Sequence, residues 1–273
     1  MIRRPPRSTQ GVSSAASDVY KRQNSLHSHT TAEVFYVLKG RWRFYWGRHG
    51  KDGEVIANEG DLVNIPTGIF RAFKNIGDCY GMLMAILGGD DAGGGVTWAP
   101  EVINNAKDYG LILGENGLLY DTKKGESLPD HVNPIPLLSE DELKDFPIVT
   151  TKEFQENFFV SASDLLESSK KGPVNVIGKS GILKDRPGFE VDFITNNSYV
   201  DEFDSPTQHQ VNMISEGNWF LEYEGGSSEL SEGDTCLIKP NLTYRITPLS
   251  LDDASLFRVT KTDDPAGPTW RMQ

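Results

Sequence analysis

The sequence is poor in cysteine and has no long apolar run. Its 273 residues include two cysteines, Cys79 and Cys236, which are too few and too far apart for a disulfide scaffold, a zinc knuckle or a CxxC redox pair. This usage favours a reducing compartment, so we expect a cytoplasmic protein. No run of about 18 apolar residues is available to span a bilayer, and we therefore expect no membrane association.

Basic residues are fewer than acidic ones. The chain carries 27 lysines and arginines against 39 aspartates and glutamates, a formal net charge of -12. Nucleic-acid binding depends on clustered basic residues that contact phosphates. We therefore expect no nucleic-acid partner and look for a small-molecule substrate or ligand.

Turn-forming and strand-forming residues are plentiful. The sequence has 27 glycines, 15 prolines and 10% aromatic residues, a composition typical of short strands joined by turns. Strand patterns fill residues 24–90 and again 174–265, and the segment 91–173 contains short helix patterns. We therefore predict an all-β protein with two β-barrels and a short helical connector.

Residues 1–23 differ in composition from the rest. They hold five basic residues and one acid, with no apolar core of the kind that a secretory signal needs. The string resembles the translation of a sequencing adapter, and we interpret it as a non-native or disordered segment without a role in function. A genuine flexible basic tail is the alternative.

The two strand-rich blocks share an order of short motifs, which indicates duplication. Gly40-Arg41-Trp42 corresponds to Gly217-Asn218-Trp219, and Glu59-Gly60-Asp61 corresponds to Glu232-Gly233-Asp234. Pro66 and Arg71 correspond in the same way to Pro240 and Arg245. Small changes in spacing are what loop insertions produce, so we predict two copies of one small barrel.

Two of the five histidines lie together, in the segment HSHTTAEVFYVLKG. Alternation along a strand would place His27 and His29 on one face, and Glu33 has the same parity. Two imidazoles and one carboxylate are the donors of a facial triad, which suits Fe(II) and also other first-row metals. We predict a metal site formed by His27, His29 and Glu33, with Fe(II) favoured and the identity of the metal open.

These motifs resemble those of the cupin superfamily. The pattern from His27 through Glu33 to Gly40 is similar to the first cupin motif, and the pattern from Gly60 to Asn75 is similar to the second. The resemblance implies a bicupin, a pair of jelly-roll barrels, and it implies a homodimer. The glycine that normally opens the first motif would fall at Lys21, so we expect the first barrel to be N-terminally truncated.

One position departs from the family pattern. The second motif normally supplies a third metal-binding histidine, where this chain has Arg71. A guanidinium that is always protonated cannot bind a metal. Either His27, His29 and Glu33 hold the metal alone and Arg71 binds an anionic substrate, or Arg71 pairs with Glu33 and the metal site has lapsed.

The second copy lacks the donor set. The aligned positions hold Asp204, Pro206, Gln210 and Arg245, so we expect no metal there. Tyr244 and Arg245 could still meet a carboxylate or a sugar at the mouth of this barrel.

Resemblance to bicupin oxygenases such as gentisate-type dioxygenases implies oxidation of a small carboxylated substrate, with Arg71 as the residue that binds or polarises the anion. The alternative is a ligand-binding or regulatory bicupin without catalysis. An isomerase is a third class, which would need a positioned base.

Overall fold

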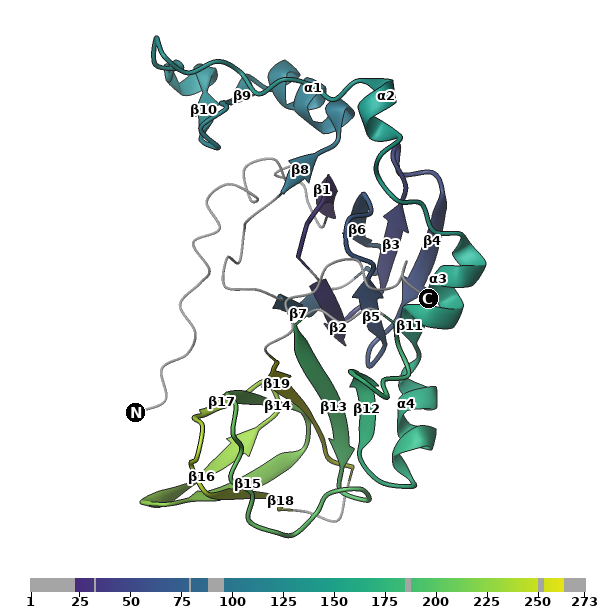
Figure 1. Ribbon diagram of the computed structural model, residues 1–273, viewed down its shortest axis with the longest axis vertical. Coiled ribbons are helices and arrows are strands. Elements are labelled where there is room, and N and C mark those ends of the chain that lie inside the picture. Colours follow the sequence, from purple (N-terminus) through teal and green to yellow (C-terminus); the bar gives the residue numbers. More distant parts are fainter. Residues whose placement is uncertain are drawn as a thin grey trace.

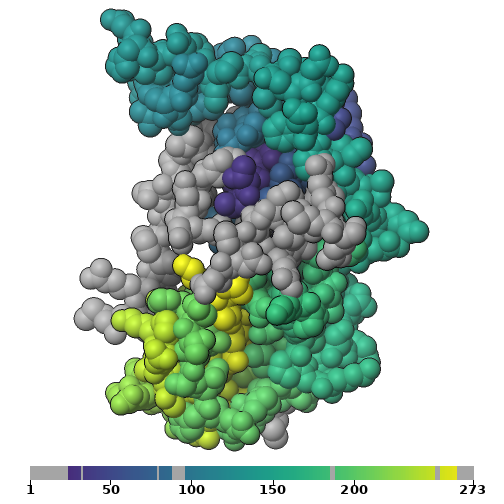
Figure 2. All heavy atoms as spheres, viewed as in Figure 1, coloured from purple at the N-terminus to yellow at the C-terminus, as the bar shows by residue number. Residues whose placement is uncertain are grey.

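The computed structural model describes residues 23–31, 33–78, 80–87, 96–184, 188–249 and 253–262. Antiparallel strands dominate, as predicted, and they form two barrels stacked along the long axis of the molecule (Figure 1). In Figure 2 the green and yellow residues of the second barrel form one lobe, below the purple and teal residues of the first barrel and the connector. Residues 1–22, the glycine-rich stretch 88–95 and Cys79 lie outside the described residues.

The first barrel consists of two facing sheets. Their strand orders are β4-β3-β6-β1-β8 and β11-β5-β2-β7. The strands are β1 (Gln23–Ser28), β2 (Glu33–Lys39), β3 (Trp42–Trp46), β4 (Gly53–Ala57), β5 (Leu62–Ile65), β6 (Arg71–Asn75), β7 (Met82–Leu87), β8 (Thr97–Trp98) and β11 (Phe159–Val160). Two of them, β8 and β11, come from the segment predicted as a connector, so this segment also extends both sheets of the first barrel.

The connector contains short helices, as predicted. They are α1 (Pro100–Asp108), η1 (Thr122–Lys124), α2 (Glu140–Leu143), α3 (Thr151–Asn157) and α4 (Ala162–Ser169), with the hairpin β9 (Leu111–Leu113) and β10 (Leu119–Asp121). Of these helices, α3 and η1 are additional to the helix patterns seen in the sequence. Pro100 opens α1, and Ser139 with Glu142 forms a capping box that fixes the start of α2. None of the helices in the described ranges has both the length and the apolar character needed to cross a membrane.

The second barrel repeats the two-sheet plan. Its sheets have the orders β12-β13-β19-β14-β17 and β16-β15-β18. The strands are β12 (Val174–Ile177), β13 (Phe189–Thr195), β14 (Gln210–Glu216), β15 (Asn218–Tyr223), β16 (Gly226–Ser231), β17 (Thr235–Ile238), β18 (Tyr244–Pro248) and β19 (Ser255–Lys261).

Backbone hydrogen bonds confirm the duplication. The amide of Gly60 donates to the carbonyl of Val37 at 2.9 Å, and the amide of Gly233 donates to that of Ile214 at 2.9 Å. Both glycines have a positive φ, 85° and 84°, which explains why glycine occupies this turn in each copy. The two Glu-Gly-Asp turns are therefore the same structural element in two barrels.

One of the predicted correspondences is wrong by one residue. His27 pairs with Arg71 across β1 and β6, and the equivalent bridge in the second barrel joins Asp204 to Tyr244. Arg71 therefore corresponds to Tyr244 and not to Arg245. Because side chains alternate along a strand, the shift of one position turns Arg245 away from the interior.

The two barrels share a hydrophobic core at their contact. It joins Val34, Tyr36 and Leu62 of the first barrel to Val191, Phe193 and Phe257 of the second. The rings of Tyr36 and Phe257 are 4.6 Å apart, and Phe257 is fully buried. Because aromatic rings from both barrels are buried against each other, we expect the two barrels to unfold as one cooperative unit. Inside the first barrel, Trp42, Phe44 and Trp46 are part of a separate hydrophobic core.

Truncation of Phe257 tests the shared core. We expect Phe257→Ala to lower the free energy of unfolding by about 3–5 kcal/mol because a large side chain is removed from a packed interior. Leu237→Ala is the control, since Leu237 is 58% exposed and its loss is expected to cost within about 0.5 kcal/mol. Urea unfolding followed by circular dichroism measures both. Two separate transitions, with only one shifted by Phe257→Ala, would show that the barrels unfold independently.

Candidate metal centre

The structure brings His27, His29 and Glu33 together. One donor atom from each residue lies within 4.8 Å of the other two. His27 is on β1 and Glu33 begins β2, whereas β1 ends at Ser28, so His29 lies just beyond the strand. The predicted convergence of the three donors is present, but it does not come from one continuous strand. The chain turns after Ser28, and this turn, with the start of β2, returns the carboxylate to the two imidazoles.

A backbone contact fixes the orientation of the His27 ring. The His27 side chain is 4% exposed, and its Nδ1 lies 2.6 Å from the carbonyl oxygen of Ser25. A carbonyl can only accept a hydrogen bond, so Nδ1 carries the proton and Nε2 keeps its lone pair. A histidine held by a backbone carbonyl in this way is typical of metal sites.

Burial and charge keep both imidazoles neutral. Desolvation holds the pKa of His27 well below its usual value, and the charge of Arg71 lowers it further. The same two causes, in the same order, lower the pKa of His29 to about 3. Both side chains are therefore uncharged at neutral pH, with one ring nitrogen free of a proton, which is the form that binds a metal ion.

Arg71 connects the two sheets of the first barrel. Its Nη2 donates to Glu33 Oε2 at 2.7 Å, and its Nη1 donates to the carbonyl of His27 at 3.1 Å. The side chains of this ion pair are 3% and 9% exposed. Among the described residues, Arg71 Nε has no hydrogen-bond partner. Of the two arrangements that the sequence left open, the pairing of Arg71 with Glu33 is present, and it leaves Glu33 Oε1 outside the pair.

The equivalent place in the second barrel is neutral. Tyr244 replaces Arg71, Gln210 replaces Glu33, and the Tyr244 hydroxyl donates to Gln210 Oε1 at 2.8 Å. Within the part of the chain that the structure describes, no second group of three histidine, cysteine or acidic side chains gathers as a metal site would. His209 is exposed.

The sequence interpretation missed two residues around His27. Besides Ser25, it missed Trp98 of β8, which pairs with His27 across the sheet and whose ring lies 5.1 Å from the imidazole. Trp98 lies in the segment interpreted as a connector, and a strand of two residues gives no periodic pattern. Only the pairing of β8 with β1 reveals that this ring forms one wall of the site.

Comparison with known proteins supports the fold. Residues 20–86 match the Cupin domain family model. No curated protein matches the chain. The structural neighbours include a mutant of Bacillus subtilis oxalate decarboxylase, with a TM-score of 0.51 and 14% identity, covering 89% of this chain and 66% of that one.

A second neighbour is a mutant of salicylate 1,2-dioxygenase from Pseudoaminobacter salicylatoxidans. Its TM-score is 0.51 at 13% identity, covering 88% of this chain and 68% of that one. This chain thus spans 66% and 68% of the two neighbours. At such identities the likeness shows the fold alone, and the fold is that of a two-barrel cupin protein.

Removal of Arg71 tests the buried ion pair. We expect Arg71→Met to cost about 3–5 kcal/mol of stability because the Glu33 carboxylate remains buried without a counter-charge. The double variant Glu33→Gln/Arg71→Tyr copies the neutral pair of the second barrel and is expected to recover most of that loss. Chemical denaturation of the two variants and the parent measures the difference. A single variant as stable as the parent would contradict the structural role of the pair.

Proposed function

We propose that the first barrel binds a divalent transition metal ion through His27, His29 and Glu33, with Fe(II) favoured. The main support for this proposal is that the donor atoms of the three side chains lie within 4.8 Å of one another in a buried part of the barrel. Two histidines and one carboxylate leave coordination positions open, as iron oxygenases require. The orientation of His27 by Ser25 supports the same proposal, because it leaves Nε2 available.

The ion pair with Arg71 is compatible with this donor set. A carboxylate has two oxygens, and Arg71 takes Oε2 of Glu33, which leaves Oε1 for the metal. In this proposal Arg71 orients the carboxylate ligand. The positive charge of Arg71 repels a divalent metal ion nearby, and an anion in the site reduces this repulsion. The charge of Arg71 therefore favours an anionic substrate.

We propose oxidation of a small carboxylated substrate as the activity. When bound, the metal supplies open positions at which a substrate and oxygen can meet. The chain supplies a wall and a charge: Trp98 lies beside His27, and Arg71, although paired with Glu33, would add positive potential for a substrate carboxylate bound at the metal. The shared fold with a salicylate dioxygenase supports this substrate class, because salicylate is itself a small carboxylate.

Metal content tests the proposal directly. After anaerobic loading with Fe(II), we expect about one metal ion per chain by mass spectrometry, since a single donor set is proposed. His27→Ala is expected to lose the metal. His209→Ala is the matched control, because this histidine is exposed in the second barrel and should leave the content unchanged. Absence of metal in the loaded parent would contradict the metal site.

Oxygen consumption tests the activity separately. We expect the loaded protein to consume oxygen with aromatic hydroxy acids or keto acids as candidate substrates, and the His27→Ala variant to consume none. The corresponding amides lack the negative charge and are expected to react at least about tenfold more slowly, because they lose the attraction of Arg71. Equal rates with acids and amides would contradict the role given to Arg71.

A second function is favoured by the ion pair itself. Arg71 already holds Glu33 at 2.7 Å, as expected for a barrel whose metal site has lapsed. Such a protein would bind a small ligand without turnover. Thermal stabilisation by a ligand, without metal and without oxygen uptake, would distinguish this function from the oxygenase.

A further inference from the structure

A row of polar side chains crosses one face of the large sheet in the second barrel. Cys236, Asn212, Arg258 and Asp192 are direct neighbours on β17, β14, β19 and β13. Residues two positions away on the same strands, among them Ile194, Ile214 and Leu256, belong to the hydrophobic core of this barrel. Side chains two residues apart share a face, so the polar row faces the barrel interior.

Arg258 is held in place without a direct ion pair, although the charge of Asp192 acts on it from the neighbouring strand. Its Nε donates to Asn212 Oδ1 at 3.1 Å, and its guanidinium lies 5.7 Å from the centre of the Tyr244 ring. Asp192 is its neighbour in the row, but the Asp192 carboxylate accepts a hydrogen bond from Asn175. Among the described residues, no carboxylate lies within 4.0 Å of the Arg258 guanidinium. The two terminal nitrogens of Arg258 therefore remain available as two adjacent hydrogen-bond donors.

A second donor in the same place also lacks an acceptor. The side chain of Asn212 is fully buried beside Tyr244 and Cys236, and its Nδ2 makes no well-formed hydrogen bond in the described part of the chain. A buried donor without an acceptor costs free energy. Positive charge and donors without acceptors in one barrel interior favour an anionic ligand.

A cavity of about 230 Å³ opens beside this group. Arg258 and Tyr244 line it together with apolar and aromatic side chains that include Ile194, Tyr199 and Ile246. Space of this size suits a small molecule, and the lining suits an apolar or aromatic body. Glu202 and Asp204 also line the cavity, and they disfavour a ligand with several negative charges.

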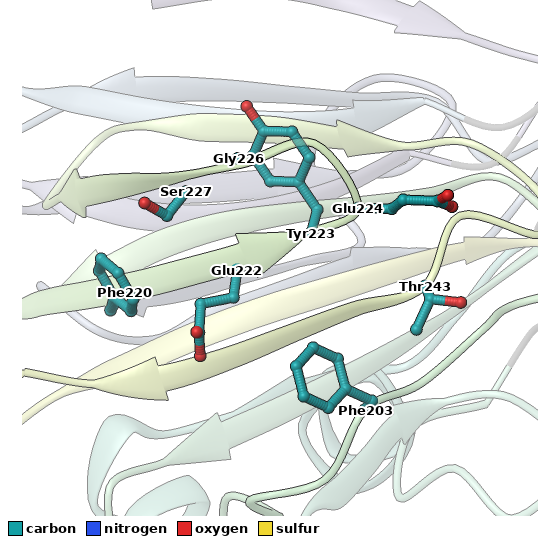
Figure 3. Close-up of a pocket in the computed structure, with 8 residues that line it drawn as sticks. All are labelled: Phe203, Phe220, Glu222, Tyr223, Glu224, Gly226, Ser227 and Thr243. Carbon is teal, nitrogen blue, oxygen red and sulfur yellow. The ribbon is translucent and has the colours of Figure 1, made fainter.

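The neighbouring arginine makes a useful contrast. Arg245 also lines the cavity, but its Nε donates to Glu222 at 2.9 Å and its Nη1 donates to Asp201 at 3.1 Å. A larger hollow of about 550 Å³ borders this ion pair, where Figure 3 shows Glu222 on its strand with Phe203 across from it. Glu222 is already paired with Arg245, and the other charged residue of the lining, Glu224, is also acidic, so this hollow offers no cation comparable to Arg258.

We propose that the second barrel binds a small monocarboxylate with an apolar or aromatic body, and that Arg258 receives the carboxylate. A planar guanidinium donates two parallel hydrogen bonds to a carboxylate, and this geometry is preorganised here by Asn212 and Tyr244. The site is separate from the proposed metal centre and does not depend on it.

Calorimetric titration of the full chain with benzoate tests the proposal. We expect benzoate to bind at a ratio of about one per chain and benzamide to bind at least about tenfold more weakly, because the amide carries no charge. Arg258→Gln is expected to weaken benzoate binding by about tenfold or more. The matched control Arg245→Gln is expected to change the affinity for benzoate by less than about twofold, because the Arg245 guanidinium is already bound to carboxylates of the protein. His27→Ala should leave the affinity for benzoate unchanged.

Three results would overturn the proposal. These are failure of the parent protein to bind benzoate, full binding by Arg258→Gln, and loss of binding in His27→Ala, which would place the ligand in the first barrel. If Arg258→Gln does not fold, the parent protein still provides the test. Benzoate should then slow modification of Arg258 by phenylglyoxal, measured by peptide mass spectrometry, and equal rates with and without benzoate would overturn the site.

Discussion

The buried contact of Arg71 with Glu33 is the constraint around which the first barrel is arranged. Arg71 on β6 reaches both the backbone of β1 and the carboxylate that begins β2, so one guanidinium joins the two sheets. Such a pair is costly to desolvate, and each partner needs the other once buried. The position of Glu33 beside the two histidines follows from this contact as much as from the turn after Ser28.

The second barrel shows that closing a barrel of this fold does not require charge. A neutral hydrogen bond between Tyr244 and Gln210 occupies the same place, and the surrounding strands keep equivalent pairings. The charged pair of the first barrel therefore contributes something other than closure. In the proposed function it orients a metal ligand and supplies positive potential for an anion, while the second barrel places its cation on another strand, at Arg258.

Much of this architecture could be predicted from the sequence because it depends on local patterns. Alternating residues gave the strands around Trp42, and the repeated Glu-Gly-Asp turns revealed two copies. The error at Arg245 arose because an arginine stands one position after the true equivalent of Arg71, and a shift of one residue exchanges the inside and the outside of a strand. The division into 24–90, 91–173 and 174–265 stays a prediction, as does the homodimer. Arg258 could not be singled out because the row to which it belongs forms only when four strands align.

The short strand β11 has a consequence for how the chain folds. Phe159 and Val160 pair with Val63 and Leu62, residues far earlier in the sequence, and β8 likewise adds to β1. Closing such long loops is slow compared with forming a hairpin. During synthesis the first barrel cannot complete both sheets until Val160 has left the ribosome. By then only α4 separates the growing chain from the second barrel, so the edge that receives β11 stays open until the next barrel begins to emerge.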